Sequence, residues 1–109
     1  MTAIFEAIWV RVANQLRPGV IVRNWSAARG YTGGTFKIDD VERTSITISG
    51  GDIQMPRRVS KGDFEKVHAV WDAYLAGNYP RSKMTSLSQN TTYILSILHL
   101  AEQDQAGMR

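Results

Sequence analysis

The sequence predicts an α+β domain in which an N-terminal helix precedes an antiparallel β-meander of three to four strands, and two C-terminal helices pack on the sheet. Apolar residues recur at helical spacing near both ends of the chain, whereas apolar and polar residues alternate within residues 35–55. Short connections join the alternating stretches, and such turns link antiparallel strands but not parallel ones. With 109 residues the chain can build one hydrophobic core, so we expect a single domain over residues 1–109.

The N-terminal helix is predicted from an apolar stripe that ends at a helix-breaking pair. The stripe consists of Phe5, Ile8, Trp9, Val12 and Leu16. Pro18 and Gly19 then stop the helix. A short β-branched stretch, residues 20–25, follows as a first strand, and residues 26–34 are predicted to form a glycine-rich loop.

Three further short strands are predicted from a period of two. The alternating apolar positions are Phe36, Ile38, Ile46, Ile48, Ile53 and Met55. Residues 40–44 and residues 50–52 supply the turns between them. Because Pro56 has no amide proton for a sheet ladder, the last strand should lie at an edge of the sheet or end there.

One long helix is predicted after the last strand. Ser60 followed by Asp63 resembles a capping box at its start, and Gly77 marks its end. Its apolar face consists of Phe64, Val67, Trp71 and Tyr74, which we expect to pack against the sheet.

The last helix is predicted to begin within residues 86–90, after a polar and basic segment. Its apolar side chains extend almost all the way round, from Tyr93 to Ala101. A small sheet and two short helices offer little area to cover so broad a stripe, so we expect a homodimer. Residues 103–109 are expected to fray as a tail.

Composition restricts the classes of function. The chain has no cysteine and no apolar run long enough to span a bilayer, so we expect a cytoplasmic protein with no membrane partner. Thirteen Lys and Arg residues against ten Asp and Glu give a net charge of +3. This basic balance modestly favours a polyanionic partner.

Sequence patterns for catalysis or for metal binding are absent. None of the serines lies in a Gly-x-Ser-x-Gly or Ser-x-x-Lys pattern. His68 and His99 have no cysteine and no second histidine at ligand spacing. Asp39, Asp40 and Glu42 are better explained by a turn than by a catalytic site. The sequence therefore favours a non-enzymatic binding module with no catalytic residue, no metal and no cofactor, and an enzyme ranks below both hypotheses that follow.

The first hypothesis is a small DNA-binding or accessory protein that contacts double-stranded DNA. A basic cluster lies where the last strand meets the capped helix, and the last helix opens with small polar side chains that suit base edges. The candidate contacts are Arg57, Arg58, Lys61, Arg81, Lys83, Gln89 and Asn90.

The second hypothesis is a homo-oligomeric accessory protein that binds a small molecule or another protein. The glycines of the predicted loop would let backbone amides approach an anion, although their spacing fits neither a Walker loop nor a dinucleotide loop. Trp25 lies among Arg23, Arg29 and Tyr31, an alternation that stacking and phosphate contacts to nucleic acid would use, although a Trp at a strand end more often closes the edge of the core. The candidate ligand residues are Trp25, Arg29, Gly30, Tyr31, Gly33 and Gly34.

A dispersed pattern in the second half of the chain carries a resemblance. It comprises residues 57–61 and 63–67, Trp71, Tyr74, Ser88, Asn90, residues 92–94, Ile97 and Leu98. Over residues 25–102 the chain resembles small bacterial proteins and domains carried in mobile gene cassettes or beside restriction systems. The resemblance implies a bacterial or mobile-element origin, and it carries over no functional residue.

Overall fold

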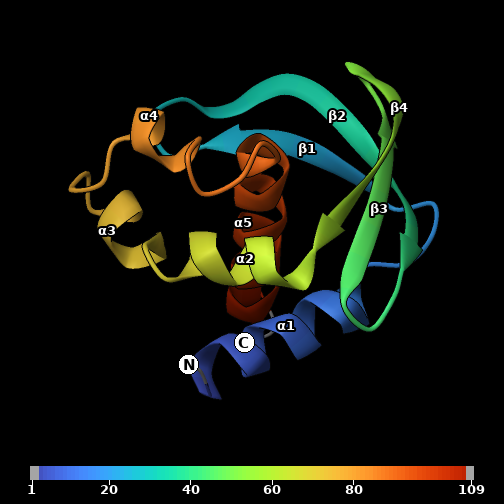
Figure 1. The fold of residues 1–109 in the computed structure, drawn as a ribbon, viewed down its shortest axis with the longest axis horizontal. Coiled ribbons are helices and arrows are strands. Elements are labelled where there is room, and N and C mark those ends of the chain that lie inside the picture. Colours follow the sequence, from blue (N-terminus) through green and yellow to red (C-terminus); the bar gives the residue numbers. More distant parts are fainter. Residues whose placement is uncertain (1–2, 108–109) are drawn as a thin grey trace.

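Four antiparallel strands form one sheet in the order in which they occur in the chain (Figure 1). The computed structural model of the protein describes residues 3–107, and the side chains of residues 5–103. The strands are β1 (Ile21–Ser26), β2 (Gly30–Val41), β3 (Ser45–Gly50) and β4 (Ile53–Ser60). Each strand pairs with the next, so the predicted antiparallel meander is confirmed with four strands.

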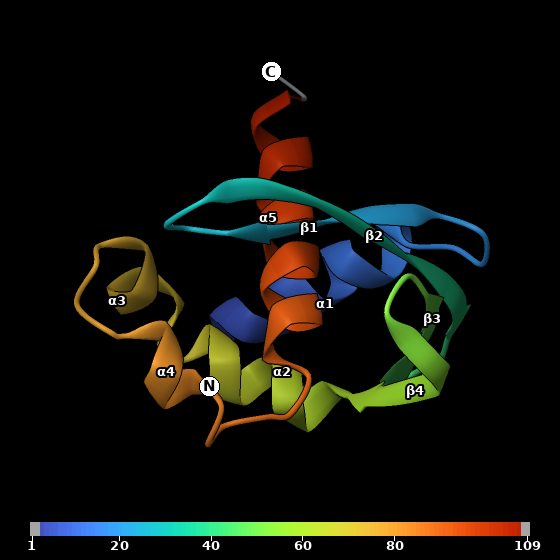
Figure 2. The same cartoon turned by 90° about the horizontal axis from the view of Figure 1, so that it is seen from above.

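The helices precede and follow the sheet, as predicted. Over residues 3–107 they are α1 (Ala3–Gln15), α2 (Lys61–His68), α3 (Trp71–Leu75), α4 (Arg81–Met84) and α5 (Thr91–Gly107). Helix α5 packs against β1 and also contacts α1 and α2, so it forms the centre of the molecule (Figure 2). In both views α3 and α4 lie on the same side of α5 as the turn between β1 and β2 (Figures 1 and 2).

The predicted long helix after the sheet is in fact two helices. Ser60 caps α2, because its Oγ accepts a hydrogen bond from the Asp63 backbone N–H at 3.1 Å, and this confirms the predicted cap at the start of the helix. The Asp63 carboxylate accepts from Ser88 Oγ at 2.9 Å, and not from the Ser60 N–H as a complete capping box requires. At Val70 the backbone N–H bonds to the Val67 carbonyl, and φ and ψ are −112° and 12°, so the helix is interrupted there. The side chains of the predicted face, Phe64, Val67, Trp71 and Tyr74, are all buried despite the break.

The predicted glycine loop is mostly strand. Strand β2 begins at Gly30, and only residues 27–29 form the turn between β1 and β2. Gly33 has a φ of 98°, which residues with a side chain rarely adopt. A Cβ at Gly34 would lie 2.7 Å from the side-chain nitrogen Nδ2 of Asn24 in β1. The glycines therefore let an irregular stretch of β2 pass close to β1, and the sequence pattern alone does not show this.

The edge and the end of the chain also differ in part from expectation. Pro56 lies in β4, which is an edge strand, as predicted. Helix α5 continues to Gly107, so residues 103–107 are helical, and the expected fraying of this tail stays a prediction; residues 108–109 lie outside the described part of the chain. Among residues 3–107, none of the helices has the length and hydropathy needed to cross a bilayer.

The apolar last helix is buried within a single copy of the chain. Ile94, Leu95, Ile97 and Leu98 each expose 1% of their surface or less. They form one core with α1, the sheet and α2. The surplus apolar surface from which the homodimer was predicted is therefore not found on the described side chains of α5.

Candidate functional site

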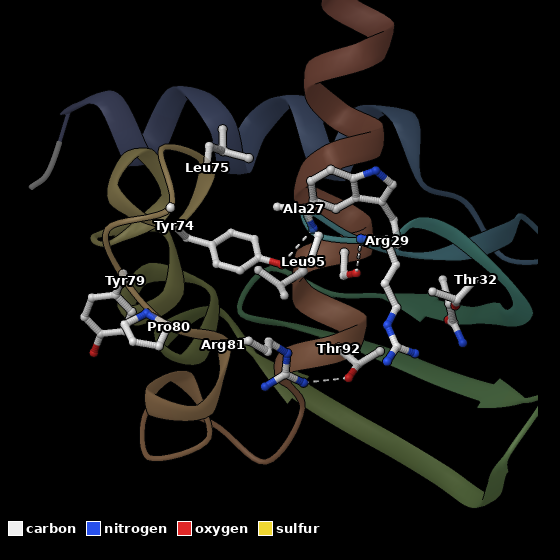
Figure 3. Close-up of a pocket in the computed structure, with 15 residues that line it drawn as sticks. Ala27, Arg29, Thr32, Tyr74, Leu75, Tyr79, Pro80, Arg81, Thr92 and Leu95 are labelled. Carbon is white, nitrogen blue, oxygen red and sulfur yellow. Dashed lines mark hydrogen bonds between the residues drawn. The ribbon is translucent and has the colours of Figure 1, made fainter.

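A pocket of about 660 Å³ opens between the turn that joins β1 to β2 and the segment from α3 to α4 (Figure 3). One wall comes from residues 24–29, and the opposite wall comes from residues 74–81. Thr32 of β2, with Thr92 and Leu95 of α5, completes the lining. Most of the exposed lining is apolar. The volume lies in the range of about 300–1,000 Å³ that is usual for small-molecule sites.

A hydrogen bond ties the two walls together. The backbone N–H of Ala27, in the turn after β1, donates to the Tyr74 hydroxyl of α3 at 2.8 Å (Figure 3). Tyr74 exposes only 6% of its surface, because its ring belongs to the core next to Trp71. The packing of α3 on the core therefore fixes the position of the turn.

Two arginines supply the charge of the pocket. Arg81 Nη2 donates to the Thr92 hydroxyl at 2.8 Å, which holds this guanidinium against the start of α5. The Arg29 guanidinium has neither an ion pair nor a hydrogen bond within the described part of the chain. In Figure 3 both guanidinium groups lie towards the Thr92 side of the pocket. None of the residues that line it is Asp or Glu, so the pocket carries uncompensated positive charge.

An aromatic stack fixes Trp25 in the wall of the pocket. Its indole lies parallel to the His99 imidazole, with ring centroids 3.9 Å apart and planes 6° apart, and Trp71 lies at 6.1 Å. Its backbone N–H donates to Ser96 Oγ of α5 at 2.9 Å. Burial lowers the pKa of His99 below its ordinary value, while the nearby Glu102 carboxylate opposes this shift. A neutral imidazole therefore backs the indole at neutral pH.

The candidate ligand residues from the sequence fall into two groups. Trp25 and Arg29 line the pocket. Tyr31 instead packs edge-on against His99 at 5.6 Å, and the Arg23 guanidinium covers its ring at 4.0 Å. The three glycines of the group, Gly30, Gly33 and Gly34, lie in β2 and do not line the pocket.

Sequence reasoning did not identify the second wall of the pocket. The sequence pattern assigns Tyr74 only to a core face and Arg81 only to DNA contacts, and it gives Tyr79 no role of its own. The end of the helix at Gly77 and the turn at Pro80 are local signals of a loop, but no signal pairs this loop with residues 25–29, about 50 positions away.

The predicted basic cluster is divided by the sheet. Arg57 and Arg58 are consecutive in β4, so their side chains point to opposite faces. Arg57 Nη1 donates to Asn90 Oδ1 at 3.1 Å. Arg58 Nη2 lies 2.9 Å from Glu42 Oε1 and, together with Ser45, lowers the pKa of that carboxyl below its ordinary value. Lys61 Nζ pairs with a carboxylate of α1, Glu6, at 2.9 Å.

The remaining DNA candidates differ in their surroundings. Lys83 is exposed on α4, and Gln89 is exposed before α5. Asn90 holds Arg57, as above, and Arg81 lies in the pocket. Of the seven candidates, Arg58 and Lys61 are therefore paired with carboxylates, and one faces the pocket.

No other protein guides the interpretation of the pocket. Comparisons with family models, with curated proteins and with solved structures give no match. Within residues 3–107, no three side chains among His, Asp and Glu converge as a metal site would require. The chemistry of the pocket lining is therefore the basis of the function proposed next.

Proposed function

We propose that this protein binds a small organic anion in the pocket between the β1–β2 turn and the α3–α4 segment. The observation that carries the proposal is the presence of Arg29 and Arg81 in a largely apolar pocket that no carboxylate lines. Guanidinium groups with free N–H donors bind carboxylates, sulfonates and phosphates through charge-assisted hydrogen bonds.

The apolar and aromatic lining favours an anion that carries a hydrophobic body. Trp25 and Tyr79, which are partly exposed, present ring surface, and the exposed Leu75 presents aliphatic surface. Burial of apolar ligand surface contributes roughly 25 cal/mol per Å², which supplies affinity beyond the charge contacts. Inorganic ions would leave this surface unused.

The lining supports binding rather than chemistry. None of the lining residues is His, Asp, Glu, Lys or Cys. These types supply most general bases and nucleophiles near neutral pH. The Tyr74 hydroxyl already accepts the Ala27 N–H, and the two guanidinium groups stay protonated. These groups hold and orient an anion.

Anilinonaphthalene sulfonate, a fluorescent aromatic anion, tests the proposal. The wild-type protein should enhance its fluorescence saturably, and Arg81→Gln and Arg29→Gln should each raise the dissociation constant about fivefold or more, because each removes a charge-assisted contact. Lys83→Gln is the matched control, because Lys83 is an exposed cation on the same helix as Arg81 and does not line the pocket. Equal loss of affinity in Arg81→Gln and Lys83→Gln would contradict binding in this pocket.

Duplex DNA binding is the other class of function that the sequence suggested, and it stays a prediction. The pairing of Arg58 and Lys61 with carboxylates reduces the charge available to phosphates. A titration with duplex DNA at about 50 mM salt separates the two classes, because binding through phosphates weakens linearly on a logarithmic salt scale. Tight binding whose salt slope decreases by roughly 2 in the Arg57→Ala, Arg58→Ala double variant would favour DNA instead.

A further inference from the structure

We propose that the ligand of the pocket is a phosphate monoester carried by a flat ring, such as an aryl or nucleoside monophosphate. The inference rests on the proposed function, because it names the chemical class of the anion in that same pocket. Two properties of the lining support it: several hydrogen-bond donors of the pocket have no acceptor within the described residues, and the pocket holds two cationic groups.

Three of the five hydroxyl groups that line the pocket accept a hydrogen bond and remain available as donors. Ser26 Oγ accepts the Arg29 backbone N–H at 3.2 Å, Tyr74 Oη accepts the Ala27 N–H at 2.8 Å, and Thr92 Oγ1 accepts from Arg81 at 2.8 Å. None of these three hydroxyls donates its own proton to an acceptor within the described part of the chain. Each of these oxygens already accepts one hydrogen bond, and its own proton is left for a ligand.

The guanidinium groups add further donors. Arg81 uses one N–H on Thr92, and Arg29 uses none of its side-chain donors within the described residues. A ligand that satisfies this set must supply several acceptor oxygens. The terminal oxygens of a phosphate monoester provide three, whereas a carboxylate provides two.

The charge of the pocket favours a dianion over a monoanion. A single carboxylate or sulfonate would neutralise one guanidinium and leave the other uncompensated. A phosphate monoester carries about −1.5 to −2 charges at pH 7, which matches two arginines that face no carboxylate in the pocket.

The aromatic walls favour a ring as the remainder of the ligand. The parallel imidazole of His99 holds the Trp25 indole at 3.9 Å, so the indole is a fixed surface. Tyr79, which is partly exposed, supplies further ring surface on the opposite wall. Aromatic side chains interact with flat rings through offset stacking or edge contacts.

Displacement of anilinonaphthalene sulfonate by two matched ligands tests this inference. Phenyl phosphate and benzenesulfonate have the same ring and a tetrahedral anionic group, but they differ by nearly one charge at about pH 7.5. Phenyl phosphate should displace the dye at an about tenfold lower concentration, since it contacts both arginines. Its advantage should shrink as the pH falls through about 6, where the phosphate loses its second charge.

Variants distinguish the effect of the two pocket arginines from the effect of positive charge elsewhere on the protein. Arg29→Gln and Arg81→Gln should each abolish most of the preference for phenyl phosphate, whereas Lys83→Gln should keep it. Thermal midpoints of all three variants show whether they are folded. If Arg29→Gln does not fold, the pH dependence of displacement from the wild-type protein tests the same charge requirement.

Each outcome decides one of the two proposals. Equal displacement by phenyl phosphate and benzenesulfonate overturns the phosphate inference, while dye binding that depends on Arg81 leaves the proposed function intact. Inorganic phosphate that binds as tightly as phenyl phosphate overturns the requirement for a ring. If calorimetry detects binding of neither the dye nor phenyl phosphate, both proposals fail.

Discussion

Tyr74 connects the core of the protein to the rim of the pocket through two parts of one side chain. Its ring is buried against Trp71, and its hydroxyl holds the turn after β1 through the Ala27 N–H at 2.8 Å. A side chain with this double role makes the pocket geometry depend on the stability of α3. The effect of the hydroxyl can be isolated because phenylalanine keeps the ring.

We predict that Tyr74→Phe lowers the free energy of unfolding by about 1 kcal/mol, the usual net contribution of one hydrogen bond. Tyr79→Phe is the control, because its hydroxyl makes no hydrogen bond within the described part of the chain. Urea denaturation at constant slope measures both variants. Equal midpoints for Tyr74→Phe and wild type would show that the Ala27 contact contributes nothing.

His99 gives the stability of the protein a pH dependence. Burial lowers the pKa of its imidazole below the ordinary 6.5, against a smaller opposing effect of Glu102. The unfolded chain therefore binds this proton more tightly than the folded chain does. The free energy of unfolding should decrease as the pH falls below 6.5 towards the folded pKa. The pKa of the Glu42 carboxyl is lowered from 4.5, so its protonation reduces the free energy of unfolding only at more acidic pH.

The variant His99→Phe tests this dependence, because it keeps a flat ring against Trp25 and removes the titrating group. We expect its stability to change less than that of the wild type between about pH 7 and pH 5. His68→Phe removes the other histidine and serves as control. A wild-type profile that His99→Phe leaves unchanged would exclude His99 as the source.

At the scale of elements, the sequence pattern predicts those helices and caps that depend on residues close together in the chain. The spacing of Phe5, Trp9 and Val12 predicts α1, and the Ser60–Asp63 cap predicts the start of α2, because both depend on residues within one or two turns. The break at Val70 depends on how α2 and α3 pack on the core, and no residue there is a strong helix breaker. The strand character of Gly30 comes from its pairing with Ser26, which intrinsic preference does not indicate.

The pocket lies beyond local pattern for a related reason. Its two arginines, Arg29 and Arg81, are separated by about 50 residues, and α5 brings their segments together. The sequence indicates a ligand-binding role for Arg29 and a DNA-binding role for Arg81, and it does not show that the two lie in one pocket. It did not show that Arg58 and Lys61 meet carboxylates from Glu42 and Glu6, which reach them through the sheet and through α1.

The burial of α5 leads to a prediction about the oligomeric state. The homodimer was predicted from apolar surface on α5, and the described side chains of this helix do not expose that surface. The exposed large hydrophobic side chains are dispersed, because Val10, Ile21, Tyr31, Met55 and Leu75 lie on five different elements. We expect light scattering to give the monomer mass of 12.2 kDa. A mass twice as large at micromolar concentration would restore the homodimer and place its interface on another surface.

At the scale of the whole molecule, the sheet and α5 form a framework that holds a donor-rich pocket at one side. Trp25 lies in the wall of this pocket, whereas Trp9 lies on α1 and its indole N–H donates to the Arg43 carbonyl at 3.1 Å. The indole resonances of Trp25 and Trp9 therefore respond to changes in two different parts of the protein. A ligand in the pocket should affect them unequally.

The indole N–H resonances in an NMR titration with anilinonaphthalene sulfonate test the presence of an anion site in this pocket most directly. We predict that the Trp25 resonance, assigned with Trp25→Phe, shifts saturably while the Trp9 resonance stays in place, and that Arg81→Gln weakens the shift but Lys83→Gln does not. A Trp25 resonance that does not move at saturating dye, or one that moves equally in Arg81→Gln, would contradict anion binding between the β1–β2 turn and the α3–α4 segment.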